Sequence, residues 1–568
     1  MKILGISCFY HDSAAALIID GKLVAAAEEE RFSRIKHDNG FPTHSVNFCL
    51  KFANLASSDL DFVVFYEKPF LKFERITLTC LEVVPKGREN FINAYRTYLK
   101  EKIWIKATII SKLKIPAEKI VFSSHHISHA ASSFYPSPFK SSAILTCDGV
   151  GEWTTTAWGE AKDNKLWLKQ EIRFPHSLGL FYSSFTQFLG FEINEGEYKV
   201  MGLAPFGKPK YKKEVEKLIN QHADGSYKLD LSYFNFLVSD KLSYSSKFIN
   251  LFGEPVSSKS ADKVKQKYAD IAASAQAVLE DKLLVIAKHI KRQTGEKNLC
   301  FAGGVALNGV ANWRIFKEAG FDNIFIQPAA GDSGGAFGAA LYFYHHVLGN
   351  KKREKFSSVY LGQQNKSEEV EEFITKNKIK ALKLTDTELI QEVAKFLSQG
   401  KVVGWVRGRF EWGPRALGSR SILADPRDKK MKDLVNSKIK FREGFRPFAP
   451  VALFEQGDKF FDVGKPIQSI LEYMLAVVPV RKKWREKLGA ITHVDGTARP
   501  QFIKREVNPI YYDLVKKFGQ KTGIPVLLNT SFNLKGEPIV NTAQEAYETF
   551  QKSGLDILVL ENYLIKKR

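Results

Sequence analysis

A pattern that occurs twice in the first third of the chain constrains the fold more than any other sequence feature. In the first copy, a strand over residues 2–7 and a polar loop precede a predicted hairpin over 14–28, whose Asp20-Gly21 pair is a strong signal for a tight turn. In the second copy, a strand over 142–146 and an acidic loop precede a hairpin over 154–172. The repetition predicts two lobes that begin with the same strand order.

Glycine-rich turns later in the same half of the chain indicate α/β construction. A helix predicted over 261–291 leads to a strand at 298–302 and a turn at 303–309, and a second strand at 323–327 leads to another glycine turn and helix. Backbone N–H groups in such turns can approach phosphates. The candidate nucleotide-binding residues are Gly149, Gly151, Gly303, Gly304 and Asn308. A purely structural role in tight turns remains open for all of them.

A change of composition near residue 350 divides the chain. The segment 350–359 is charged and aperiodic, which is typical of a linker. Beyond it, we expect a helix capped by Thr387 and closed by Gly400, a strand over 402–406, and a capping box from Thr542 to Glu545. The sequence therefore predicts two domains, a bilobal α/β domain at 1–349 and a second α/β domain at 360–568.

Charge and hydrophobic pattern limit the partners that we expect. The net charge of +22 is spread as lysines over helices and loops, and no basic run is interleaved with stacking aromatic residues, so a nucleic-acid partner is not favoured. No apolar run is long enough to cross a membrane, and the start of the chain lacks the pattern of a secretory signal. The scattered cysteines are typical of reduced core thiols, and we expect a cytoplasmic protein without a membrane partner.

Two histidines and two aspartates form a candidate metal site. His125 and His129 lie four residues apart and would share one face of a helix. Asp148 follows the first strand of the second copy, and Asp332 lies in a glycine-rich loop. Two imidazoles with carboxylates suit Fe²⁺, and the same set could bind Mn²⁺ or Zn²⁺. Surface histidines at a polar helix start, with aspartates in ordinary turns, are the alternative interpretation.

Other polar residues are candidates for catalysis and for anion binding. His11, in the first polar loop, could deprotonate a hydroxyl group, although a structural histidine in a turn is nearly as plausible from sequence alone. In the second domain, arginines and amides cluster in loops punctuated by Gly and Pro, and guanidinium groups match phosphate and carboxylate oxygens. The members of this cluster are Arg415, Lys440, Arg446, Arg499, Asn529 and Ser531. Isolated structural salt bridges would be the alternative role for these arginines.

These segments together resemble the O-carbamoyltransferases of antibiotic and nodulation-factor biosynthesis, the nodulation-protein-U and cephalosporin-carbamoyltransferase type. The resemblance runs from end to end and includes GISCFYHDSAAALI, EEERFSRIKHD, HHISHAASSFY, FAGGVALN, GDSGGAFGAAL, GRFEWGPRALGSRSILADPR, FREGFRPFAP and LLNTSFN. It implies a TsaD-like domain of the actin/hexokinase type followed by a YrdC-like α/β domain. It also implies that carbamoyl phosphate and ATP form carbamoyl adenylate, whose carbamoyl group is then passed to a hydroxyl of a small polar acceptor.

The resemblance also implies roles for particular residues. His125, His129, Asp148 and Asp332 would bind an iron-type metal, and ATP would act with Mg²⁺. The adenylate would be held by Arg415, Arg446, Asn529 and Ser531, with Lys36, Lys440 and Arg499 as additions, while His11 would lie on the acceptor side. A tRNA threonylcarbamoyl-adenosine enzyme, built from the same domain types, is the alternative. The acceptor (a sugar, an aminoglycoside or a similar natural product) is not identified by the sequence, and a homodimer is a further expectation.

Overall fold

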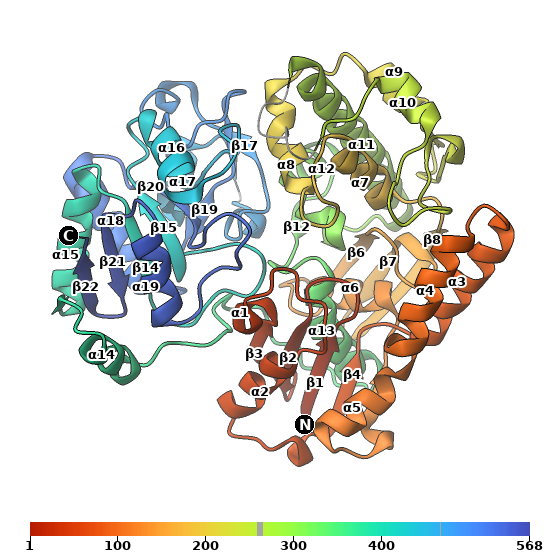
Figure 1. Cartoon of the computed structure of the whole chain (residues 1–568), viewed down its shortest axis with the longest axis horizontal. Coiled ribbons are helices and arrows are strands. Elements are labelled where there is room, and N and C mark those ends of the chain that lie inside the picture. Colours follow the sequence, from red (N-terminus) through yellow and green to blue (C-terminus); the bar gives the residue numbers. More distant parts are fainter. Residues whose placement is uncertain (258–264, 466, 568) are drawn as a thin grey trace. The chain divides into compact units, whose positions relative to one another are not determined.

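The computed structural model describes residues 1–257, 265–465 and 467–567 (Figure 1). The chain forms two compact units. Unit 1 contains Met1–Glu29 and Asn39–Phe356, and unit 2 contains Glu30–Asp38 and Ser357–Arg568. Among the described residues, every helix is too short or too polar to traverse a lipid bilayer.

Unit 1 is built on two five-stranded sheets with one topology. The strands of the first sheet are β1 (Lys2–Ser7), β2 (Ala14–Ile19), β3 (Lys22–Glu28), β4 (Phe62–Phe65) and β5 (Ile120–Phe122). Those of the second are β6 (Ser141–Cys147), β7 (Thr154–Lys162), β8 (Lys165–Arg173), β11 (Asn298–Ala302) and β12 (Asn323–Phe325). The orders are β3-β2-β1-β4-β5 and β8-β7-β6-β11-β12, with the first three strands antiparallel and the last two parallel to the central strand in each. The predicted duplication is confirmed.

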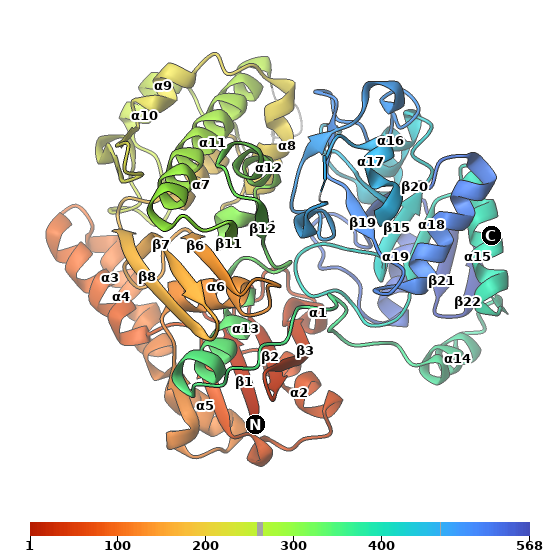
Figure 2. The same cartoon turned by 180° about the vertical axis from the view of Figure 1, so that it is seen from behind.

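Two helices each follow the last strand of one sheet in sequence but pack against the other sheet. Helix α6 (His125–Phe134) follows β5 but packs on β6 and β11, whereas α13 (Asp332–Tyr342) follows β12 but packs on β1 and β2. Figures 1 and 2 show both helices between the two sheets. They contact each other at backbone distance, because a Cβ atom added to Gly338 would lie 1.8 Å from the carbonyl oxygen of Ser128. Because each helix packs on the sheet of the other lobe, the first turns of α6 and α13 lie close together.

The remaining helices of unit 1 surround this centre. Between β3 and β5, the longer helices are α2 (Thr43–Phe52), α3 (Pro69–Val83), α4 (Arg88–Lys100) and α5 (Ile105–Leu113). Around the second sheet, they are α7 (Leu178–Phe188), α8 (Glu197–Leu203), α10 (Ser246–Phe252), α11 (Gln266–Thr294) and α12 (Gly309–Glu318). Helix α11 matches the predicted long helix, whose expected first residues, 261–264, lie outside the described part of the chain.

The segment predicted as a linker is held on unit 1 over its first half. The guanidinium group of Arg353 donates hydrogen bonds to the carbonyl oxygens of Phe134 (2.5 Å), Phe139 (2.8 Å) and Tyr135 (3.2 Å). These carbonyls lie at and just beyond the C-terminal end of α6, where backbone acceptors lack partners within the helix. Arg353 thus caps the helix that carries the two candidate metal-ligating histidines, His125 and His129.

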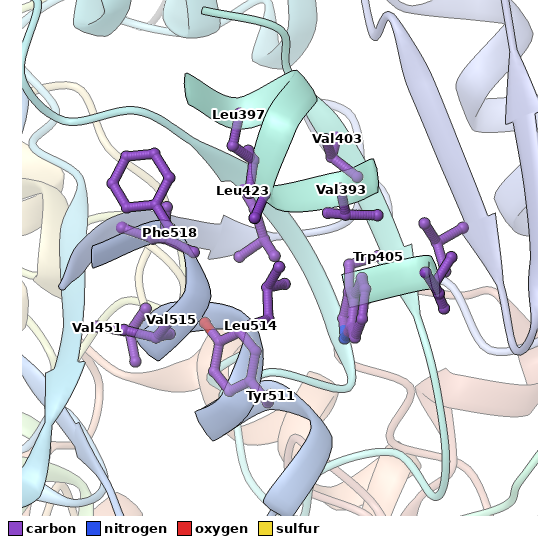
Figure 3. Packing of buried hydrophobic residues seen from close by; sticks show 14 of the residues in the cluster. Val393, Leu397, Val403, Trp405, Leu423, Val451, Tyr511, Leu514, Val515 and Phe518 are labelled. Carbon is purple, nitrogen blue, oxygen red and sulfur yellow. The ribbon is translucent and has the colours of Figure 1, made fainter. Parts of the chain in front are cut away.

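Unit 2 contains an eight-stranded mixed sheet in the order β13-β22-β21-β14-β15-β20-β16-β19. Its strands are β13 (Ala381–Lys383), β14 (Val403–Val406), β15 (Arg420–Ala424), β16 (Ala449–Leu453), β19 (Gln501–Ile503), β20 (Val526–Ser531), β21 (Ile557–Leu560) and β22 (Tyr563–Lys566). Helices α15 (Asp386–Ser398) and α18 (Pro509–Thr522) and strand β14 contribute to a core that includes Val393, Leu397, Trp405, Leu514 and Phe518 (Figure 3). Burial of such side chains at roughly 1.5–3 kcal/mol each stabilises the unit.

The sequence predicted caps for two helices of unit 2, and the structure differs from both predictions in detail. Thr542 caps its helix as predicted, since its side chain accepts from the Glu545 N–H at 3.3 Å, but the Glu545 carboxylate accepts from the Asn541 N–H (2.8 Å), so the capping box is not completed. The helix expected to be capped by Thr387 is instead capped by Thr385, whose hydroxyl accepts from the N–H of Glu388. The Thr385 N–H in turn donates to Oε2 of Glu388 at 2.9 Å. This reciprocal pair of hydrogen bonds favours Thr385 over Thr387 as the helix cap.

We expect Gly338→Ala to destabilise the protein by about 1–3 kcal/mol, because the new methyl group would overlap the Ser128 carbonyl where α6 and α13 cross. Urea unfolding followed by tryptophan fluorescence measures the change. Gly331→Ala is the matched control, since its added carbon meets no atom within 4 Å, and it should change stability by less than about 0.5 kcal/mol. Equal stability of the two variants would contradict a backbone contact at this crossing.

Candidate functional site

The candidate metal residues converge where α6 and α13 begin. His125 and His129 lie on the first turns of α6, Asp332 is the first residue of α13, and Asp148 directly follows β6. One ligand atom from each of the four side chains lies within 4.8 Å of all the others, and all four residues are buried. The structure therefore brings together the complete set that the sequence pattern suggested.

Distances within this cluster suit a cation held by two imidazoles and two carboxylates. The Nε2 atoms of His125 and His129 lie 3.0 Å apart and 2.9 and 3.1 Å from Oδ2 of Asp148. Asp332 Oδ1 lies 3.6 and 3.4 Å from the same nitrogens and accepts no hydrogen bond from any described residue. A buried carboxylate oxygen without a donor is costly unless a cation is bound nearby. The donor set is that of a divalent transition metal.

The electrostatics of the cluster also favour positive charge. Burial alone would raise the pKa of Asp148, but hydrogen bonds from His125 and His129 hold that pKa well below its usual range. Burial would lower the pKa of His125, but Asp332 and Asp148 raise it well above its ordinary value. The carboxylates thus create a strongly negative environment, in which a bound cation would be stabilised.

Glu67 and Glu152, which sequence reasoning missed, hold the metal-site helix in place. Glu152 Oε1 accepts from the N–H groups of His125 (3.0 Å) and Lys68 (2.8 Å), so it caps the N-terminus of α6. Glu67 Oε2 lies 3.6 Å from His125 Nδ1, on the far side of the imidazole from Asp148. A weak signal for Glu67 was available, since it lies just beyond β4 as Asp148 lies just beyond β6. Carboxylates behind a ligand histidine fix its orientation.

The glycine-turn candidates have structural roles in this arrangement. Gly303 has φ +97°, and a Cβ atom there would lie 2.2 Å from the Cys147 carbonyl oxygen. The Gly304 N–H donates to Asp148 Oδ1 at 3.0 Å, and a Cβ atom on Gly151 would lie 3.0 Å from His125. Gly149, the first glycine after Asp148, has more room. A Cβ atom there would meet only Tyr10 Oη, at 3.7 Å.

Asn308 and His11 lie near the same centre with partners of their own. Asn308 Oδ1 accepts from the Ala311 N–H (3.1 Å) and so caps α12, while its amide donates to Gln276 (3.0 Å). His11 Nδ1 lies 3.0 Å from Asp12 Oδ2. Burial lowers the pKa of His11, but Asp12, followed by the carboxylates of the metal cluster, raises it to about 9.

A second group of candidates gathers in unit 2 around a buried lysine. Lys440 is only 3% exposed, and its ammonium group donates to the carbonyl oxygens of Ser531 and Asn533, both at 2.8 Å. Burial lowers the pKa of Lys440 well below its ordinary value, and the nearby charges of Arg442, Arg446 and Lys36 lower it further. Among the residues that the structure describes, no carboxylate forms an ion pair with this ammonium group. Buried positive charge of this density favours an anionic ligand.

Arg415 and Arg499 form a second part of the cationic group. Burial lowers the pKa of Arg415 well below its ordinary value, and the charge of Arg499 lowers it further. Asn529 is fully buried on β20, two residues before Ser531 on the same strand, and residues at this spacing share a face. Its amide donates to the Ala416 carbonyl at 3.2 Å, next to Arg415 in sequence. Strand β20 therefore links the two parts of the group.

Three further residues, which sequence reasoning missed, support these loops. The buried Glu411 carboxylate accepts from the N–H groups of Leu417 (2.7 Å), Ser419 (2.7 Å) and Arg420 (3.2 Å), which shapes the loop that carries Arg415. Arg31 donates to the Gly413 carbonyl at 2.8 Å. Arg34 donates to the carbonyls of Ile539 (2.7 Å) and Pro538 (3.0 Å). Arg31 and Arg34 belong to the Glu30–Asp38 segment of unit 2, which also carries Lys36.

Comparison with known proteins finds two family models on this chain. The model described as "Carbamoyltransferase N-terminus" matches residues 2–341, and that described as "Carbamoyltransferase C-terminus" matches residues 394–567. Nodulation protein NolNO of Sinorhizobium fredii is 37% identical over 99% of this chain and 79% of its own length. An uncharacterized protein of Synechocystis sp. is 45% identical over 100% of this chain and 96% of its own length.

Likeness to solved structures is much weaker. Component A of the (R)-2-hydroxyglutaryl-CoA dehydratase of Acidaminococcus fermentans aligns with 61% of this chain and 99% of its own, at 16% identity and a TM-score of 0.34. A likeness at this level does not bear on the function of the chain.

We expect His129→Asn to lower the affinity for a divalent metal at least about 10-fold, because it removes one of four ligand groups. Anaerobic incubation with Fe²⁺, desalting and measurement of bound metal by mass spectrometry tests this. His126→Asn is the matched control. The ring of His126 lies outside the cluster, where its Nδ1 pairs with Thr146 Oγ1 at 2.7 Å, so this variant should retain metal. Equal metal content in both variants would contradict the site.

Proposed function

Because the chain belongs to the carbamoyltransferase family, we propose that it is an ATP-dependent O-carbamoyltransferase that works through carbamoyl adenylate. In this proposal the YrdC-like domain expected over 360–568, which makes up most of unit 2, forms the adenylate. The TsaD-like domain expected over 1–349, which makes up most of unit 1, passes the carbamoyl group to a hydroxyl of a small polar acceptor.

The buried cations of unit 2 are the observation that carries the proposal. Carbamoyl phosphate, ATP and one water would give carbamoyl adenylate, pyrophosphate and phosphate, and all of these except water carry phosphoryl oxygens. Lys440 is buried and Arg415 and Arg446 are partly buried, and together they offer the positive charge that such oxygens require. Arg446 also pairs with Glu443 at 3.4 Å, whereas no carboxylate among the described residues forms an ion pair with the Lys440 ammonium group. Phosphoryl chemistry depends mainly on positioning and charge stabilisation, which a preformed cationic group supplies without reorganisation.

In unit 1, the four-residue cluster would hold a divalent metal, for which we propose Fe²⁺. A metal bound there would supply a Lewis acid for a carbonyl oxygen. His11 lies within electrostatic range of the cluster, since Asp332 and Asp148 both contribute to its raised pKa. We propose that His11, which a pKa of about 9 keeps protonated at neutral pH, donates to the acceptor hydroxyl and orients it. As the hydroxyl oxygen bonds to the carbamoyl carbon, its proton passes to water and AMP leaves. Glu67 and Glu152 would keep His125 in its binding orientation.

We expect two substitutions to separate the half-reactions. His125→Ala should abolish carbamoyl transfer, because a metal ligand is lost, but leave pyrophosphate release that depends on carbamoyl phosphate largely intact. Arg446→Ala should lower that pyrophosphate release at least about 100-fold, as is typical when one charge-stabilising donor is removed. A pyrophosphate assay and mass spectrometry of carbamoylated products measure the two steps.

The control for this pair is Arg505→Ala, which removes only an exposed ion pair with Asp513 and should affect neither step. If His125→Ala and Arg446→Ala lose both half-reactions to the same extent, the proposed division between the units is wrong.

The Glu30–Asp38 segment supports the first half-reaction in this proposal. We expect Arg34→Ala to lower pyrophosphate release about 10-fold, because two hydrogen bonds that fix the 538–539 loop are lost and the cationic group is displaced. Arg34→Lys should recover part of the rate, and the metal content of unit 1 should stay at the wild-type level in both variants. Unchanged pyrophosphate release in Arg34→Ala would show that the segment does not support this step.

A further inference from the structure

Helix α3 (Pro69–Val83) buries two cationic side chains and exposes large apolar ones. The inward face carries two cations, since Lys72 is 4% exposed and Arg75 is 7% exposed, whereas Phe70 is 70% and Leu81 is 64% exposed. An amphipathic helix normally buries its apolar face because burial of charge is costly. Two buried cations on α3 therefore need a reason other than packing.

The two cations have different partners. The Lys72 ammonium group lies 2.6 Å from Glu67 Oε2 and 5.0 Å from the centre of the Tyr10 ring, so its charge is balanced. The Arg75 guanidinium lies 5.0 Å from the centre of the Phe174 ring. No residue in the described part of the chain forms a hydrogen bond or an ion pair with Arg75. The residue as a whole is 7% exposed, and the guanidinium group has an aromatic face beside it.

A second buried polar group lies near this guanidinium. The hydroxyl of Tyr98, on α4, is buried and forms no hydrogen bond with any residue that the structure describes. Burial lowers the pKa of Arg75, while the charges of Tyr98, Tyr10, Glu67 and Glu152 oppose that change, so these groups lie within electrostatic range of the guanidinium. Arginine and tyrosine donors together form the usual protein contacts of a carboxylate or another oxyanion.

The carboxylates of Glu67 and Glu152 connect the surroundings of Arg75 with the four-residue cluster. Glu67 pairs with Lys72 and lies 3.6 Å from His125 Nδ1. Glu152 accepts from the backbone of both Lys68, at the start of α3, and His125. A molecule bound at Arg75 would therefore lie close to the groups that, in the proposed function, carry out the transfer.

We propose that Arg75 and Tyr98 bind an anionic group, foremost a carboxylate, of the hydroxylated acceptor. This inference rests on the proposed function and narrows it to acceptors that carry a hydroxyl and an oxyanion on one small molecule. The guanidinium fork matches the two oxygens of a carboxylate, and burial beside Phe174 strengthens the interaction by excluding water. Lys72, already paired with Glu67, positions the surrounding groups.

Matched pairs of alcohols test the inference. D-glucose and D-glucuronate, and glycerol and D-glycerate, are supplied with carbamoyl phosphate and ATP, and carbamoylated products are measured by mass spectrometry. Calorimetric titration of the full chain with D-glucuronate, without ATP, measures binding independently of turnover. D-glucose 6-phosphate is included to distinguish a phosphate from a carboxylate.

We expect the wild-type protein to favour the acid of each pair and Arg75→Met to reduce that preference at least 10-fold, with Arg75→Lys intermediate. Arg88→Met, an exposed arginine on α4, is the matched control and should retain the preference. Because Arg75 contacts no carboxylate, the methionine variant should fold, which circular dichroism checks.

The outcomes separate this inference from the proposed function. Binding of D-glucuronate that depends on Arg75, without transfer to any alcohol, would support the anion site and count against the transferase mechanism. Transfer that is equal for acids and neutral alcohols, and unchanged in Arg75→Met, would overturn the anion site and leave the mechanism standing. A loss of ATP affinity in Arg75→Met, or a failure of all the acids to bind, would also overturn it.

Discussion

The crossing of α6 and α13 at backbone distance is the contact on which the geometry of unit 1 depends. Gly338 lets α13 approach the Ser128 carbonyl of α6, and each helix begins with residues of the cluster. Because each helix packs on the sheet of the other lobe, neither lobe alone could bring two histidines to two aspartates. The duplicated sheets serve to hold this crossing in place, and the cluster is its consequence.

The two units concentrate buried charge of opposite sign. In unit 1, the carboxylates of the cluster raise the pKa of His125 and the two histidines lower the pKa of Asp148, so the cluster stabilises positive charge. Unit 2 buries Lys440 beside further cations, where phosphoryl oxygens would be stabilised. Burying either set costs free energy that folding alone does not recover. Such costs are characteristic of sites that are completed by a ligand.

Local patterns predicted those features that depend on neighbours in sequence. The strand order of the two lobes, the helix cap at Thr542 and the shared helix face of His125 and His129 follow from spacing. Features made by tertiary contact were not predictable. Glu152 is an ordinary loop residue until the fold places it at the start of α6, and the buried side of α3 opposes its amphipathic pattern. The competition between Thr385 and Thr387 as caps was decided by the reciprocal bond to Glu388.

The Glu30–Asp38 segment limits how far the two chemical steps can be assigned to separate lengths of chain. It lies within the region matched by the N-terminal family model, yet it belongs to unit 2, where Arg31 and Arg34 hold loops beside the cationic group. Both of its ends continue directly into unit 1, at Glu29 and Asn39. A length of chain that began after residue 356 would therefore lack part of its own framework, so the two units are interdependent in structure even if they divide the chemistry.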